Sequence, residues 1–123
     1  MNKYRNQKVM LDGELFDSKG EADRWSQLRL LERARVVQSI SRQPRFIMSV
    51  NGCEICELRA DFAYYESGRQ IIEDFKWMMT TEFRLKLKLF KALHPNIEFR
   101  VTNRKGEVLK VRTRKASKLK VAA

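Results

Sequence analysis

The chain has 123 residues and a formal net charge of +11, which arises from 26 lysine and arginine residues against 15 acidic residues. That length is enough for one domain with a small core but not for two, and 43% hydrophobic residues are typical of a globular protein. No apolar run approaches the roughly 18 residues of a membrane span, and the basic N-terminus lacks the apolar segment of a secretory signal. We therefore expect a soluble, cytoplasmic protein with reduced cysteines and no membrane partner.

The positive charge is concentrated towards the ends of the chain. Residues 100–123 hold nine basic residues and one acidic residue, whereas residues 9–81 hold ten basic and twelve acidic residues. Lysine and arginine contacts to phosphate supply most of the sequence-independent affinity for nucleic acids. A nucleic acid is therefore the expected partner, with solubility alone, ribosomes or anionic lipid as the alternatives.

The first predicted element is a helix over about residues 19–36, which Ser18 would cap at its N-terminus. Its apolar residues recur at helical spacing: Ala22, Trp25, Leu28, Leu31 and Val36.

Three extended segments follow, at residues 36–50, 53–66 and 69–77, and each is rich in β-branched or aromatic residues. Asn51-Gly52 separates the first two, and Glu66-Ser67-Gly68 separates the last two. Both sequences favour tight hairpin turns. We therefore expect an antiparallel meander of three strands.

A second, basic amphipathic helix is predicted over residues 82–94, ending before Pro95. Residues 97–103 and 108–114 would add two strands. The resulting order, αβββαβ with one further strand, predicts an α/β (α+β) domain with a mixed central sheet flanked by helices. Residues 1–113 would form this single domain, and residues 114–123 a basic C-terminal tail.

Two acids and a lysine lie within these apolar segments. Strand alternation places Asp74 and Lys76 on one face and Glu73 on the other, and the short turn at Ser67-Gly68 would bring Asp61 within reach of Asp74. Two neighbouring carboxylates repel unless a proton or a cation offsets their charge. Oxygen ligands of this kind suit Mg²⁺, which keeps several waters and also binds phosphate.

Glu21 in the first helix, then Asp61, then Asp74-x-Lys76, followed by a second helix, resemble the PD-(D/E)XK nuclease superfamily in motif order and in the succession of elements. The resemblance covers residues 8–101. Three stretches look like small phage-encoded members related to Holliday-junction endonucleases: "FDSKGEADRWSQLRLLERA", "SRQPRF" and "ADF…EDFKW…TTEFRLKLKLFKA". The resemblance implies a restriction-endonuclease-like core and the activity of a metal-dependent endodeoxyribonuclease. The protein would be located in the host cytoplasm if it is phage-encoded.

The resemblance assigns a role to each of these residues. Asp61 and Asp74 would hold Mg²⁺, for which Mn²⁺ can substitute, with the backbone carbonyl of Phe75 as a further ligand. Glu21 would reach the same cluster directly or through water. Lys76 would orient or help deprotonate the attacking water and stabilise charge on the phosphate. The products would carry 5′-phosphate and 3′-hydroxyl ends.

The resemblance also implies DNA as the substrate, with a preference for branched, Holliday junction-like DNA. A homodimer would supply the two active sites that symmetric cutting of both strands requires. Two positions depart from the family pattern: Ala60 replaces the usual proline, and Trp77 follows the lysine where similar phage proteins often carry a small residue. Trp77 would narrow the approach of the substrate.

The proposed site residues also have structural interpretations. Glu21 completes a capping box with Ser18, Asp61 could be a turn or edge residue, and Asp74 with Lys76 could form an ordinary ion pair on a solvated face.

Other notable residues are interpreted as structural. Glu73 faces away from Lys76, and His94 is expected to cap the second helix. Cys53-x-x-Cys56 lacks the second pair of ligands that a zinc site needs.

Two groups of basic residues are candidates for nucleic-acid binding. The first lies on the second helix, where an ordinary solvated face is an equally good interpretation: Arg84, Lys86, Lys88 and Lys91. The second would form a phosphate-binding arm at the C-terminus: Arg112, Arg114, Lys115, Lys118 and Lys120. The alternative to an enzyme is a non-catalytic DNA- or RNA-binding protein on a nuclease-like scaffold, and a third hypothesis is an accessory protein that docks on a nucleic-acid complex.

Overall fold

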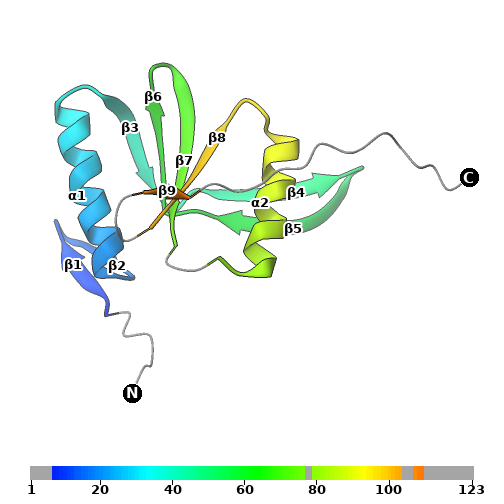
Figure 1. The fold of residues 1–123 in the computed structure, drawn as a ribbon, viewed down its shortest axis with the longest axis horizontal. Coiled ribbons are helices and arrows are strands. Elements are labelled where there is room, and N and C mark those ends of the chain that lie inside the picture. Colours follow the sequence, from blue (N-terminus) through cyan, green and yellow to red (C-terminus); the bar gives the residue numbers. More distant parts are fainter. Residues whose placement is uncertain (1–6, 77–78, 104–106, 110–123) are drawn as a thin grey trace, which may run out of the picture.

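The computed structural model describes residues 7–76, 79–103 and 107–109. Within these ranges the chain forms two helices and nine strands (Figure 1). In chain order these are β1 (Val9–Leu11), β2 (Glu14–Phe16), α1 (Lys19–Arg33), β3 (Val37–Arg42), β4 (Arg45–Val50), β5 (Cys53–Arg59), β6 (Phe62–Glu66), β7 (Arg69–Phe75), α2 (Thr81–Leu93), β8 (Glu98–Thr102) and β9 (Val108–Leu109). The fold is mixed α+β, as predicted.

A five-stranded mixed sheet forms the centre of the molecule, in the order β3-β6-β7-β8-β9. β7 is its middle strand and pairs antiparallel with β6 and parallel with β8. The parallel pair requires a crossover, which α2 supplies. The β6–β7 hairpin closes through Ser67 and Gly68, both with positive φ (51° and 77°), as expected for a two-residue turn.

The predicted three-strand meander is correct only in part. Residues 36–50 and 53–66 do pair antiparallel, but each segment divides into two strands, at Gln43-Pro44 and at Ala60-Asp61. Gln43 has a φ of 54° and Pro44 carries no N–H to donate, so the ladder cannot continue regularly. As a result β3 and β6 belong to the central sheet, whereas β4 and β5 form a separate arm (Figure 1). Asp61 therefore lies at this break and not inside a strand.

Both predicted helices are present with slightly different ends. The Ser18 hydroxyl accepts a hydrogen bond from the Glu21 backbone N–H (3.1 Å), as an N-cap should. α1 ends at Arg33, earlier than predicted, because Arg35 adopts a left-handed conformation with a φ of 62°. α2 begins after its own N-cap, Thr80, and His94 caps its C-terminus, as predicted.

The β1–β2 hairpin was not predicted. Its turn is Asp12-Gly13, with φ values of 52° and 76°. Asp-Gly between two apolar stretches is a strong hairpin signal, so the sequence did contain the information. The hairpin packs beside α1 (Figure 1).

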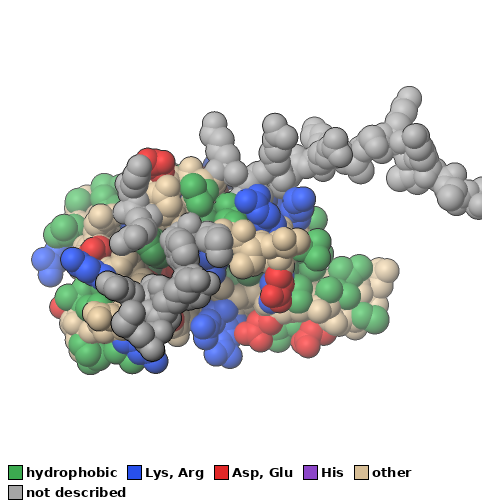
Figure 2. All heavy atoms as spheres, turned by 60° about the horizontal axis from the view of Figure 1, so that its bottom comes forward, with side chains coloured by type: hydrophobic (Ala, Val, Ile, Leu, Met, Phe, Trp, Pro, Cys, Tyr) green, Lys and Arg blue, Asp and Glu red, His purple; other side chains and the backbone are tan. Residues whose placement is uncertain are grey.

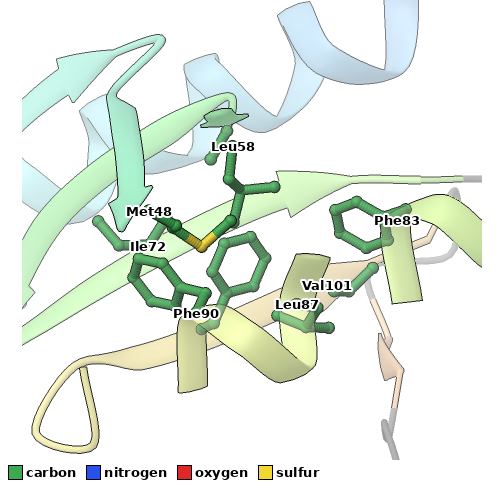
Figure 3. Packing of buried hydrophobic residues seen from close by; sticks show 9 residues of the cluster. Met48, Leu58, Ile72, Phe83, Leu87, Phe90 and Val101 are labelled. Carbon is green, nitrogen blue, oxygen red and sulfur yellow. The ribbon is translucent and has the colours of Figure 1, made fainter. Parts of the chain in front are cut away.

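The hydrophobic core is divided between the two faces of the central sheet. Ile71 packs with α1 residues such as Trp25 and Leu28, whereas its neighbour Ile72 packs on the opposite face with α2. Figure 3 shows this second cluster, in which Met48 and Leu58 of the β4–β5 arm contact the same core as Phe90 of α2. The arm is thus anchored to the domain through α2.

The C-terminal strands are only partly described. β8 lies inside the predicted segment 97–103, and β9 covers the first residues of the predicted strand 108–114, whose remainder lies outside the described residues.

Cys53 and Cys56 are both free thiols on the arm. Neither helix in the described part of the chain is long and apolar enough to cross a membrane.

Candidate functional site

Three carboxyl groups from separate parts of the sequence meet near the C-terminal end of β7. Glu21 comes from the first turn of α1, Asp61 from the junction of β5 and β6, and Asp74 from β7 itself. The charge of the Asp61 carboxyl raises the pKa of Glu21 and that of Asp74. Asp61 therefore lies near both of the other acids. The structure thus brings together all three acids that the sequence analysis selected.

Backbone hydrogen bonds hold Asp61 in place although it lies outside a strand. Its Oδ2 accepts a hydrogen bond from the Phe75 backbone N–H (2.7 Å), and its own N–H donates to the carbonyl of Glu73 (3.2 Å). Because β7 holds both the carboxylate and the backbone N–H of Asp61, this side chain has few alternative positions. The break between β5 and β6 therefore directs the Asp61 carboxylate towards the end of β7.

Asp74 and Glu21 are both buried, with 2% and 4% of their surface exposed. Burial, and then the Asp61 carboxyl, raise the pKa of Asp74 to about 8, against a lowering effect of Lys76. Burial, and then Asp61 and Asp17, raise the pKa of Glu21 to about 7, against a lowering effect of Arg42. At neutral pH this cluster therefore retains protons unless a cation takes their place.

Lys76 lies beside Asp74, as strand alternation predicted. Its Nζ is 3.2 Å from Asp74 Oδ2 and 4.8 Å from the centre of the Phe83 ring in α2. Its backbone N–H donates to the carbonyl of Thr102 (2.8 Å), which extends the β7–β8 pairing by one residue. The lysine ammonium is therefore held at the sheet end, between the acids and the start of α2.

Two carboxylate oxygens in this cluster have unused capacity. Glu21 Oε1 and Asp74 Oδ2 are buried and accept no hydrogen bond of good geometry, although a cation lies near each of them, Arg42 at 3.5 Å and Lys76 at 3.2 Å. Oxygens of this kind are suitable ligands for a hard divalent cation. Within the described ranges no three acidic, histidine or cysteine side chains already have metal-binding geometry, so the carboxylates would have to draw closer around an ion.

Glu73 lies on the opposite face of β7 and is fully buried. Arg24 of α1 donates to both of its carboxylate oxygens (2.6 and 2.8 Å), and the Tyr64 hydroxyl donates to Oε1 (2.7 Å). This agrees with the structural interpretation of Glu73. The Arg24 guanidinium neutralises the charge of Glu73, and the same pair links α1 to the central strand.

Arg42 has a place in the site that sequence reasoning missed. Its Nη2 lies 3.5 Å from Glu21 Oε1 and donates to the carbonyl of Leu15 (3.1 Å), and its Nη1 lies 3.5 Å from Glu14. The guanidinium also covers the Phe16 ring at 3.9 Å. The β1–β2 hairpin thus positions an arginine against Glu21, a role that could not be inferred while that hairpin was unrecognised.

Of the four predicted basic residues on α2, one lines a cavity beside the candidate site. Lys86 lines a cavity of about 580 Å³ together with Lys76, between the β4–β5 arm and the start of α2. Arg84, Lys88 and Lys91 do not line it, because their i, i+4, i+7 spacing places them along a different stripe of α2. Trp77 and the five tail residues from Arg112 to Lys120 lie outside the described residues.

A search of curated proteins finds no match to the sequence. The profile of the family described as "Protein of unknown function (DUF1064)" matches residues 1–111. Because this match covers most of the chain, including every described element, the protein belongs to the DUF1064 family.

Proposed function

We propose that this protein is a Mg²⁺-dependent DNA endonuclease of the PD-(D/E)XK type. The observation that carries the proposal is the meeting of Glu21, Asp61 and Asp74 at the end of β7, with Lys76 Nζ 3.2 Å from Asp74. A buried cluster of carboxylates with raised pKa values is costly for a purely structural role and is typical of functional sites. The mixed α+β fold is compatible with a nuclease-like core.

The residues present fit a hard divalent cation. Asp61 and Asp74 would bind it, and Glu21 would complete the ligand set directly or through water, using the buried oxygens that have no hydrogen-bond partner. When bound, Mg²⁺, or Mn²⁺ in its place, would polarise the phosphodiester and lower the pKa of a bound water.

The other groups prepare the site for a phosphate. The Phe75 N–H orients Asp61, and the positive charge of Arg42 favours the ionised form of Glu21, which is the form that binds a cation. Lys76 is half-buried next to the cavity, where its ammonium can hold an attacking water or stabilise negative charge on the phosphate.

DNA as the substrate is supported by the net charge of +11 and by the basic cavity next to Lys76. The preference for branched DNA, the homodimer and the 5′-phosphate products rest on the sequence resemblance alone.

A non-catalytic nucleic-acid-binding protein is the second candidate. The observation that favours it is the ion pair between Lys76 and Asp74, which partly offsets the buried charge without any metal. In that case the acids would have a structural role only, and the basic surface alone would bind nucleic acid.

Cleavage of labelled DNA separates the two candidates. We expect wild-type protein to cut a four-way junction in preference to matched linear duplex and single strand, in Mg²⁺ but not in EDTA. Asp74→Asn should abolish cutting but keep DNA affinity, whereas Asp23→Asn, which removes an exposed acid from α1, should cut like wild type. Binding without cutting of any substrate, in Mg²⁺ or Mn²⁺, would leave only the non-catalytic candidate.

A further inference from the structure

The cavity beside Lys76 has walls from two separate elements. One wall is the β4–β5 arm, which contributes Arg45, Glu57 and Arg59, and the other is the first turn of α2, which contributes Glu82 and, one turn later, Lys86. The cavity is largely open to solvent, and its volume of about 580 Å³ can hold the phosphate and sugar of a nucleotide. In Figure 2, charged side chains gather near the base of the arm, and its far end is mostly hydrophobic or uncharged.

The lining of this cavity holds four basic and two acidic side chains, and one of the basic residues, Lys76, also pairs with the buried Asp74. Arg45 lies 3.6 Å from Glu57, and Lys86 lies 3.4 Å from Glu82, but those two carboxylates are 50% and 79% exposed. Ion pairs in such exposed positions contribute little and exchange easily for another anion. Within the described part of the chain, Arg59 forms no ion pair or side-chain hydrogen bond.

The placement of the two arginines is unfavourable in the free protein. Arg45 and Arg59 are direct partners in the β4–β5 register, so two like charges stand opposite each other across the arm. Such pairs destabilise a hairpin. A bound anion removes this repulsion, and the N-terminus of α2 lies on the other side of the cavity, where the helix dipole favours an anion.

We propose that this cavity binds the sugar–phosphate backbone of the DNA strand, at a phosphate that neighbours the one presented to the carboxylate cluster. The inference rests on the proposed function for the identity of the strand. Lys76 lines the cavity and contacts Asp74, so a strand whose phosphate enters the carboxylate cluster continues directly into the cavity. The charged lining contacts phosphates without reading bases, and the site is therefore independent of sequence.

Salt dependence of DNA binding tests the site without requiring cleavage. Affinity for a labelled duplex is measured in EDTA by fluorescence anisotropy between 50 and 200 mM salt, a range in which each phosphate contact contributes about 0.9 to the slope of log K against log salt. We expect the doubly substituted Arg45→Gln/Arg59→Gln protein to lose about 1 to 2 from the wild-type slope. Arg45→Lys/Arg59→Lys should keep most of it, because a phosphate accepts either cation.

The matched control is Arg69→Gln, which removes an exposed arginine at the opposite end of β7, about 20 Å from Lys76 along the strand. It should leave the slope unchanged. A double Gln variant with the wild-type slope, or with a loss no larger than that of Arg69→Gln, overturns the inference. Equal losses of salt slope in the Gln and Lys variants, accompanied by lower melting temperatures, would show that the two arginines stabilise the fold. That result would also overturn the inference.

Cleavage assays on the same proteins keep this inference separate from the nuclease proposal. An unchanged slope with Mg²⁺-dependent cutting intact removes the backbone site and leaves the nuclease. A reduced slope in a protein that never cuts DNA keeps the backbone site and removes the nuclease. Absence of any salt-dependent DNA binding by the wild-type protein removes both.

Discussion

Asp74 is a buried carboxyl placed beside a second carboxyl, and this environment sets its protonation. Its pKa of about 8 in the folded protein lies far above its ordinary value of 3.8. The folded state therefore binds more protons than the unfolded state between about pH 4 and pH 8, and the free energy of unfolding must fall as the pH rises through that window. Glu21, with a pKa of about 7, acts in the same direction.

The first prediction concerns this pH dependence in EDTA. Between pH 5 and pH 8 we expect the unfolding free energy of the wild-type protein to fall, because both carboxyls hold their protons more tightly in the folded protein than in the unfolded chain. Asp74→Asn keeps the shape of the side chain but cannot ionise, so its melting temperature should fall less over the same range. Thermal unfolding followed by circular dichroism measures both, and identical pH profiles for the two proteins would show that Asp74 ionises normally.

At the scale of elements, the junction of α1 with β7 positions the site. Gly20 packs directly against the ring of Phe75, and an added Cβ would overlap the far end of that ring. One residue later in α1 is Glu21, and the Phe75 N–H holds Asp61. The contact of Gly20 with the Phe75 ring therefore brings the first turn of α1 to the end of β7, where Asp61 and Asp74 lie.

Substitution of Gly20 by alanine tests this contact. Phe75 or the first turn of α1 must shift, which we expect to cost about 1–3 kcal/mol in urea unfolding and to reduce cleavage further than the lost stability explains. Lys19→Ala, at the exposed neighbouring position, should do neither. A Gly20→Ala protein as active and stable as wild type would contradict the packing described here.

Glu73 ties the same helix to the sheet through Arg24. Arg24→Ala leaves a fully buried carboxylate without its cation, which we expect to cost about 3–5 kcal/mol of unfolding free energy. Arg33→Ala, at an exposed position in the last turn of α1, should cost no more than about 0.5 kcal/mol. Chemical denaturation of the two variants checks the difference, and similar small losses in both would mean that Tyr64 alone suffices for Glu73.

At the scale of the whole molecule, periodicity and turn signals predicted both helices, the β6–β7 hairpin and the common face of Asp74 and Lys76. These features depend on local spacing, which the sequence displays directly. The division of the meander at Gln43-Pro44 and Ala60-Asp61 was missed, because two continuous extended segments conceal a change of sheet. For the same reason the cavity that Arg45 and Arg59 line together with Lys76 could not be predicted, since it depends on how the separate arm lies against α2.

Phosphate binding by the basic C-terminal tail, residues 114–123, remains a prediction. Removal of residues 114–123 deletes Arg114, Lys115, Lys118 and Lys120 beyond the last described strand, β9. We expect the truncated protein to bind every DNA sequence more weakly and to lose up to about 3 to 4 from the salt slope. Its melting temperature should not change. An unaltered slope would show that these four residues do not contact phosphate.

Binding of Mn²⁺ tests the central claim directly, because it requires no knowledge of the substrate. Isothermal titration calorimetry of wild-type protein at pH 8 should show a saturable site, with protons released as the carboxylates become ligands, and Mg²⁺ should compete for it. Asp74→Asn should lose the site and Asp23→Asn should keep it. A wild-type protein without saturable Mn²⁺ binding, or an Asp74→Asn variant that binds Mn²⁺ equally well, would contradict the account of a metal-dependent centre at the end of β7.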